Sequence, residues 1–408
     1  MQQRRLGLGV VVLFLVAVGL TACAGFGTGE QESGPIKVGV LVPLSGPASQ
    51  GGQQMKNAFE LAAEQINASG GVNGQPVELI FEDTGGDPQK GVTAAKKLIE
   101  QDQVWGLAGI FTSGVALAVS PVAMEAQKPL VVTVAAAPAV TDQVKEDPET
   151  FKYLFRTGAH VVHFAQNTEP FADIVGASTY YYIAQDAIWA KGLGKALEAR
   201  LTRKGVQKVG ETFVPRGTEE FAAPIADIQS KNPDLVIAAL VSAEGVPFAK
   251  QYYDAQVPIP FIATAGVLTF EENVRGMGEK ADYVNFFAWS WDIPVTEKTQ
   301  PFYKAFREKY GFAPSGYEDV RSYDGLHVMV EALKQAGNTD PDTWAEAMQT
   351  LRYTGVAGVY EFDESHQAKW GEGLLTGLLG QWRGGQAVIF WPEAVATGRF
   401  EQAAWWKQ

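Results

Sequence analysis

The stretch IKVGVLVPLSGP, residues 36–47, decides the fold class. Its first seven residues are almost all apolar, and two prolines and a glycine follow closely. This composition is typical of a buried β-strand that ends in a turn. In residues 52–68, Met55, Phe59 and Ile66 then recur at helical spacing, with charged residues on the other side. The stretch therefore predicts a strand, a turn and a helix, in that order.

The same alternation continues along most of the chain. Further strands are expected at residues 76–83, 104–110, 130–134, 180–184, 207–213, 235–240 and 260–263. Helical or turn-rich segments follow each of them, which implies parallel strands joined by right-handed crossovers, with helices on both faces of the sheet. Because so many strands exceed one compact sheet, we expect an α/β protein with two doubly wound, Rossmann-like lobes.

The end of the chain has a different pattern. Residues 358–363, 374–382 and 387–391 are short apolar segments separated by glycine-containing turns. Such segments predict a hairpin-like finish in place of another strand-helix unit.

Composition excludes several classes of protein. The chain has 408 residues, of which 46% are hydrophobic and 19% charged, so it is globular and long enough for two or three domains. Its 33 basic and 46 acidic side chains give a net charge of -13, which makes a nucleic-acid partner unexpected. A single cysteine rules out an intramolecular disulfide and any site of several cysteines around a metal.

The first residues have the layout of an export signal. Arg4 and Arg5 precede an apolar run at residues 6–20, and small residues follow. An uncleaved membrane anchor is the alternative, although the run is shorter than the about 20 residues that a span needs. The sequence LTAC at residues 20–23 resembles the bacterial lipoprotein signal, in which the cysteine is acylated after cleavage. We therefore expect a signal peptide at 1–22, lipidation of Cys23 and a flexible tether at 23–34 that holds the body at a membrane.

Several motifs resemble one family of binding proteins. They are KVGVLVPLSG at 37–46, INASGGVNG at 66–74, FEDT at 81–84, GIFTSG at 109–114, FRT at 155–157 and YDG at 323–325. Their order and content are similar to the leucine/isoleucine/valine-type periplasmic binding proteins, from Pro35 to the C-terminus.

The resemblance implies an architecture and a function. Members have the type I fold, in which two lobes joined by three crossings of the chain close around a small solute and deliver it to the permease of an ABC importer. Lobe one would comprise residues 35–155 and 287–353, and lobe two residues 156–286 and 354–408. No cofactor, metal or catalysed reaction is implied. A ligand-sensing lobe that signals through a partner protein is the main alternative, and a hydrolase on this scaffold is another.

The position of the site also follows without the family. Ligands of open α/β sheets lie outside the carboxyl ends of the strands, where loops and helix starts present free N–H groups. That rule selects the loops after Val42, Ile110, Val134, Ala184, Leu240 and Ala263.

Ser113 is the first candidate in these loops. With Thr112 and Gly114 it lies between a strand and an apolar helix, so it can offer a hydroxyl and a helix-start N–H to a carboxylate or carbonyl oxygen. An ordinary helix cap has the same local pattern. The resemblance favours ligand binding, because Ser113 falls where the family has its carboxylate-binding serine.

Two positions depart from the amino-acid binders. The family usually has a hydroxyl residue where this chain has Ala136, although the N–H groups of Val134 and Ala136 can still bind an oxygen. Ala265 stands where an acidic residue commonly pairs with the ligand's ammonium group. Either the ligand lacks that ammonium, as a carboxylic acid or amide does, or another acid replaces the partner. The replacements considered are Glu244, Asp186 and Asp324, each of which we expect at the surface by default.

Other candidates come from the resemblance alone. Trp189 aligns with an aromatic residue that covers the ligand, but it also suits a core position at a helix start. Gln50 replaces a frequent aromatic residue, and Ser242 stands where some members have tyrosine. Trp289 lies near the third predicted crossing, where hinge packing is expected.

An enzyme is not expected. The chain lacks the Gly-x-Ser-x-Gly, phosphate-loop and His-Glu-x-x-His motifs. His160 and His163 are three residues apart and could meet on one helix face, but no third ligand has matching spacing, so we expect no metal site.

Overall fold

The computed structural model describes residues 34–264 and 266–406. Cys23, with the rest of the predicted signal and tether, lies outside the described residues, and so does Ala265. Within those two described ranges, no helix has the length and apolarity needed to cross a membrane.

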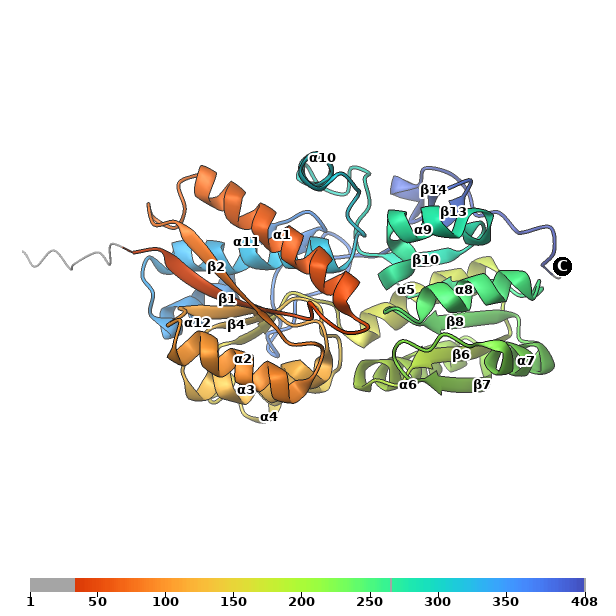
Figure 1. The fold of residues 1–408 in the computed structure, drawn as a ribbon, viewed down its shortest axis with the longest axis horizontal. Coiled ribbons are helices and arrows are strands. Elements are labelled where there is room, and N and C mark those ends of the chain that lie inside the picture. Colours follow the sequence, from red (N-terminus) through yellow and green to blue (C-terminus); the bar gives the residue numbers. More distant parts are fainter. Residues whose placement is uncertain (1–33, 265, 407–408) are drawn as a thin grey trace, which may run out of the picture. The chain divides into compact units, whose positions relative to one another are not determined.

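The first sheet is wholly parallel. Its strand order is β2-β1-β3-β4-β5, built from β1 (Ile36–Val42), β2 (Val77–Asp83), β3 (Gly106–Gly109), β4 (Leu130–Val132) and β5 (Leu154–Arg156). Its helices are α1 (Ser49–Ala68), α2 (Pro88–Glu100), α3 (Ser113–Glu125), α4 (Ala139–Glu146), α11 (Glu318–Ala336) and α12 (Pro341–Thr350). Helices α1 and α11 pack together on one face, and α2 and α3 on the other (Figure 1). Because both faces are covered, β1 is buried along almost its whole length.

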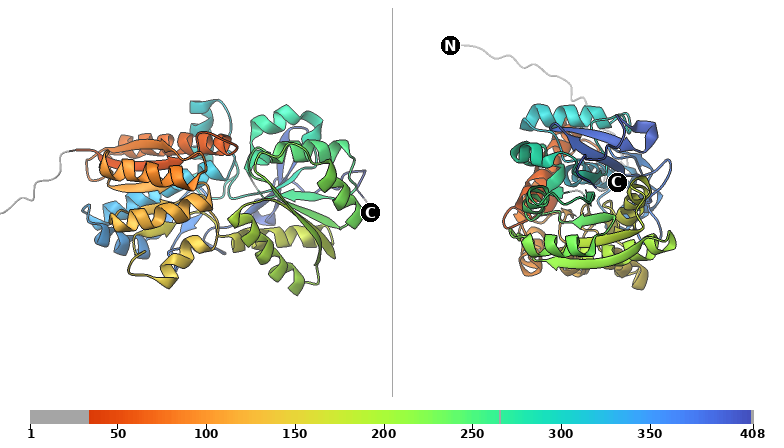
Figure 2. Two further views of the ribbon diagram at one scale, coloured as in Figure 1. Left: turned by 60° about the horizontal axis from the view of Figure 1, so that its bottom comes forward. Right: turned by 90° about the vertical axis from the view of Figure 1, so that its right-hand side faces the viewer.

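The second sheet is mixed. Its order is β14-β13-β10-β9-β8-β6-β7, with β6 (Thr179–Gln185), β7 (Gln207–Val214), β8 (Leu235–Ala239), β9 (Phe261–Ala263) and β10 (Asn285–Ala288) parallel. The strands β13 (Leu378–Arg383) and β14 (Gln386–Trp391) form an antiparallel hairpin beside β10. Its helices are α5 (Val161–Ile174), α6 (Ile188–Arg203), α7 (Ala222–Lys231), α8 (Gly245–Asp254) and α9 (Glu271–Met277). Figure 2 shows this sheet with helices on both sides.

The fold class predicted from the sequence is confirmed, with differences in detail. Strands β5 and β10, of three and four residues, were not expected, although the equally short β3, β4 and β9 were. The predicted terminal hairpin is present, but its first strand begins at Leu378 and not at residue 374. A glycine fixes the start of α1: a Cβ on Gly52 would collide with the carbonyl oxygen of Pro43.

The chain passes between the two sheets three times. It leaves the first sheet after β5 and enters the second at β6. After β10 it returns through α10 (Thr299–Tyr310) to α11, which packs on β3 and β4. The short pair β11 (Tyr353–Thr354) and β12 (Val359–Tyr360) then leads to β13. The predicted boundary at 286/287 falls inside β10, which pairs only within the second sheet; the lobe limits stay a prediction.

One arginine touches all three connections. The side chain of Arg321, on α11, is fully buried. Its Nη1 donates to the hydroxyl of Tyr360 at 3.1 Å and to the carbonyl of Thr157 at 3.5 Å, and its guanidinium lies 4.7 Å from the ring centroid of Trp289. Thr157 follows β5, Trp289 follows β10 and Tyr360 ends β12. Trp289 is fully buried, which agrees with packing at this crossing, while its role in a hinge stays a prediction.

Candidate functional site

A cleft of about 460 Å³ lies at the carboxyl ends of strands from both sheets. Its walls are the loops after β2 and β3 of the first sheet and after β6 and β7 of the second. The lining residues are Gly86, Pro88, Thr112, Ser113, Gly114, Asp186, Ala187, Ile188, Trp189, Pro215 and Arg216. This volume suits a small organic molecule.

Ser113 lines the cleft at the first turn of α3. Thr112, and not Ser113, is the residue before the helix, and it makes no side-chain cap. The Oγ of Ser113 accepts a hydrogen bond from the N–H of Ala137 at 3.2 Å, which leaves its hydroxyl hydrogen available to donate. The first N–H groups of a helix have no intrahelical acceptor and attract anions. The start of α3 can therefore bind a carboxylate or carbonyl oxygen.

Trp189 lines the opposite wall, at the start of α6. Its side chain is 7% exposed and its ring centroid lies 5.9 Å from that of Phe164. The preceding Ile188 is 52% exposed. Trp189 thus has the largely buried position at a helix start that was predicted, and it also borders the cleft. Its contact with a ligand stays a prediction. Together with Pro88 and Pro215, these residues give the cleft an apolar side.

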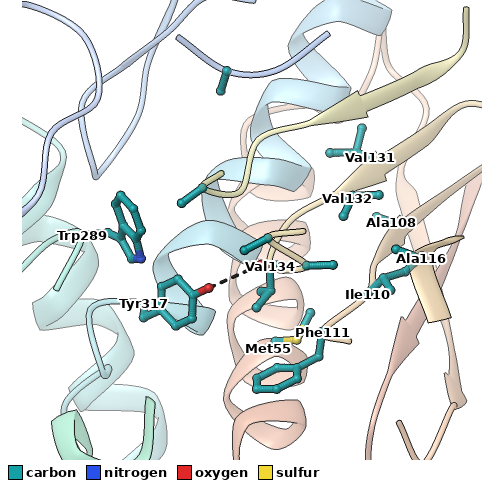
Figure 3. Close-up of a cluster of buried hydrophobic side chains, with 14 of the residues drawn as sticks. Met55, Ala108, Ile110, Phe111, Ala116, Val131, Val132, Val134, Trp289 and Tyr317 are labelled. Atoms are coloured by element: carbon teal, nitrogen blue, oxygen red, sulfur yellow. Dashed lines mark hydrogen bonds between the residues drawn. The ribbon is translucent and has the colours of Figure 1, made fainter. Parts of the chain in front are cut away.

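Val134 and Ala136 do not line this cleft. Both are buried, and the carbonyl of Val134 accepts a hydrogen bond from the Tyr317 hydroxyl at 3.4 Å (Figure 3). The guanidinium of Arg156 fixes this loop by donating to the carbonyls of Ala135 at 3.3 Å and Ala137 at 2.6 Å. Ligand binding by the N–H groups of Val134 and Ala136 stays a prediction.

Gln50 and Ser242 also lie outside the cleft lining. The amide of Gln50 pairs with the side chain of Asn273 on α9. The N–H of Ser242 donates to Glu244 at 3.1 Å, while its buried hydroxyl has no partner among the residues that the structure describes. Their predicted role as ligand contacts stays a prediction, as does that of Ala265.

The three acids considered as ammonium partners have separate environments. Glu244 is fully buried, and its carboxylate accepts from the N–H of Gly217 at 3.0 Å as well as from Ser242. Asp324, on α11, is also fully buried and accepts from the N–H groups of Val356 and Ala357. The expected surface position is therefore wrong for these two. Asp186 is exposed at the edge of the cleft and forms an ion pair with Lys191 at 2.5 Å.

Arg216 is the charged cleft residue that the sequence analysis missed. It lies in the loop after β7, between a proline and a glycine. Burial lowers the pKa of its guanidinium, and the carboxylate of Glu244 offsets part of that effect. The predicted strand at 207–213 was a usable signal, because Arg216 lies in the loop after it, and such loops lie at the ligand-binding edge of a parallel sheet.

His160 and His163 have structural contacts in α5. The Nδ1 of His160 accepts from the N–H of Val162 at 3.0 Å at the start of the helix. The ring of His163 stacks on Trp370 with centroids 4.8 Å apart. Burial lowers the pKa of His160 to about 4 and that of His163 to about 3, so both rings are neutral at pH 7.

Comparison with known proteins agrees with this architecture. Residues 35–376 match the family model described as periplasmic binding protein. The chain belongs to the periplasmic binding protein family. Proteins of this family are extracytoplasmic solute receptors that work with ABC transporters.

Individual relatives extend the match over nearly the whole chain. The "Leu/Ile/Val-binding protein homolog 3" of Brucella melitensis is 28% identical over 89% of this chain and 98% of the relative. An ABC transporter substrate-binding protein from Sphaerobacter thermophilus is 27% identical, with a TM-score of 0.76 over 90% of this chain and 98% of that one. A solute-binding protein from Rhodopseudomonas palustris, in complex with 3,4-dihydroxybenzoic acid, has 24% identity and a TM-score of 0.75 over 85% and 93% of the two chains.

Proposed function

We propose that this periplasmic binding protein captures a small organic solute with a carboxylate or amide group and delivers it to the permease of an ABC importer. The observation that carries the proposal is the cleft lined from both sheets, with Ser113 and the start of α3 on one side and Trp189 on the other. A solute that touches both lobes binds the closed form better than the open one, which is the requirement for capture by closure.

The solute lacks an α-ammonium group. Among the described cleft residues the only carboxylate is that of Asp186, which is paired with Lys191. Glu244 and Asp324 are occupied by backbone N–H groups. An ammonium buried in this cleft would therefore lack a dedicated partner, and an unpaired buried charge is costly.

The protein is attached to the membrane as a lipoprotein. Residues 20–23, LTAC, contain the only cysteine of the chain, at the end of the apolar run. Acylation of Cys23 would hold the mature chain at the outer side of the cytoplasmic membrane.

Calorimetric titration tests the solute class. Leucine and its des-amino analogue, 4-methylpentanoate, have the same apolar body and carboxylate and differ in the ammonium group. We expect the acid to bind about ten- to a hundredfold tighter, corresponding to roughly 1–3 kcal/mol. Tighter binding of leucine would contradict the proposed solute class. Mass spectrometry of the solute that copurifies with the protein provides a second, independent reading.

A further inference from the structure

The loop that carries Arg216 is fixed by a hydrogen bond to a buried acid, and Arg216 itself lines the cleft. Its neighbour Gly217 has a φ of 75° and donates its N–H to the carboxylate of Glu244 at 3.0 Å, so the loop after β7 is fixed to a buried acid. Glu244 lies on the protein side of the loop and also accepts from the N–H of Ser242. The fixed backbone places the Arg216 guanidinium at the wall of the cleft.

The guanidinium extends from the second lobe to the first. A Cβ on Gly86 would lie 3.8 Å from Nη1 of Arg216 and 3.4 Å from the methyl group of Thr112. Thr112 is the residue directly before α3. The positive end of Arg216 and the start of α3 thus approach the same point beside Gly86.

Arg216 also has unused hydrogen-bonding capacity. Its Nε is buried and has no partner within the described part of the chain. A buried guanidinium nitrogen without a partner loses its hydration and gains nothing in return. A planar anion at this place would accept two parallel hydrogen bonds from the guanidinium, which is the geometry that arginine and carboxylate share.

We propose that Arg216 binds the carboxylate of the solute, together with the Ser113 hydroxyl and the start of α3, and makes the cleft select acids over amides. This inference rests on the proposed function and narrows its solute class. Arg216 belongs to a loop of the second sheet and Ser113 to a loop of the first. One carboxylate can satisfy both only when the lobes are together, so the same contact gives selectivity and favours closure.

The other lining residues of the cleft indicate the chemical character of the remainder of that acid. Ile188, Trp189, Pro88 and Pro215 provide apolar surface. Arg216 is the one cationic side chain among the described lining residues, so the cleft matches one negative charge and not two. The solute class is an apolar monocarboxylate, aliphatic or aromatic.

Matched acid and amide probes test the role of Arg216. We would titrate 4-methylpentanoate against 4-methylpentanamide, and benzoate against benzamide, into the wild-type protein and the variants Arg216→Gln and Arg216→Lys. Arg275→Gln is the control, because Arg275 is exposed on α9, pairs with Glu271 and carries the same charge change away from the cleft. Melting temperatures establish that each variant is folded.

We expect at least one acid to bind the wild type ten- to a hundredfold tighter than its amide. Arg216→Gln should remove most of that preference, because affinity for the acid should fall while affinity for the amide should change less than about threefold. Arg216→Lys keeps the charge without the planar fork and should have an intermediate preference. Arg275→Gln should behave as the wild type.

The possible failures are distinct. If neither acid binds the wild type, both the proposed solute class and the role of Arg216 are wrong. If an acid binds and its preference over the amide survives in Arg216→Gln, only the role of Arg216 is wrong. Should Arg216→Gln not fold, Arg216→Lys carries the test, and a wild-type preference in that variant would overturn the bidentate contact.

Discussion

The side-chain amides of Gln50 and Asn273 form a reciprocal pair between the two lobes. The Nε2 of Gln50 donates to Oδ1 of Asn273 at 3.2 Å, and Nδ2 of Asn273 donates back to Oε1 of Gln50 at 3.1 Å. Gln50 lies in the first turn of α1, and Asn273 in α9. A backbone bond between the lobes runs nearby, from the N–H of Ala243 to the carbonyl of Pro47 at 3.2 Å.

Removing this pair should favour separation of the lobes. Gln50→Ala loses three hydrogen bonds between the lobes, two with Asn273 and one with Glu272 at 3.1 Å, and leaves each lobe's core intact, so we expect affinity for 4-methylpentanoate to fall about three- to tenfold. The melting temperature should change little. Gln53→Ala, which breaks a bond to Asn57 within α1, is the matched control. If the effects of Gln50→Ala and Asn273→Ala simply add in the double variant, the two side chains do not act as a pair.

Solute binding should make the protein more compact. Small-angle scattering of the protein with saturating 4-methylpentanoate should give a smaller radius of gyration than the protein alone, because closure about the three crossings brings the lobes together. The same measurement on Arg216→Gln at equal acid concentration is the control, since reduced binding should leave more of the open form. A profile that does not change with saturating acid would favour a preformed pocket.

Stability should depend on pH through Glu318. This side chain is fully buried at the start of α11, and burial, reinforced by Asp319, raises its pKa from about 4.3 in an unfolded chain to about 8. Between these values the folded protein keeps a proton that the unfolded chain releases. The free energy of unfolding therefore falls as pH rises from about 4.3 to 8, by up to about 1.4 kcal/mol per pH unit for this group.

Glu318→Gln tests that contribution, because the amide is never charged. We expect the melting temperature of the variant to decline less than that of the wild type between pH 5 and pH 8. Glu308→Gln is the control, since Glu308 is exposed on α10 beside Lys304. Parallel declines in the wild type and Glu318→Gln would show that Glu318 titrates normally.

The anchor prediction concerns Cys23. Metabolic labelling with a fatty acid should mark the wild-type protein and leave Cys23→Ala unlabelled, because the chain has a single cysteine. The variant should also retain its signal segment, which intact mass measures. Absence of label from the wild type would exclude the lipoprotein form.

Sequence reasoning reached the fold and part of the site for physical reasons. The apolar run of β1 and the helical spacing in α1 are local signals. Repetition of this strand-helix order along the chain predicted the two lobes. Ser113 and Trp189 lie at helix starts that follow strands, and both line the cleft.

Other features depend on residues far apart in the chain. Gln50 and Asn273 are separated by 223 positions, and no local pattern indicates that their amides meet. Arg216 gains its significance from Gly86 and Thr112, which belong to the other lobe. The burial of Glu244 and Asp324 likewise depends on backbone N–H groups that only the folded loops bring close.

The contacts of Arg321 constrain how the lobes can move. Thr157, Trp289 and Tyr360 each belong to a different connection, and all three contact the same guanidinium. A sliding displacement of one connection would break its contact while the others remained, whereas a rotation about an axis through the arginine preserves all three. These contacts therefore favour rotation of the lobes over sliding, and substitutions around Arg321 would alter the balance of open and closed forms without touching the solute.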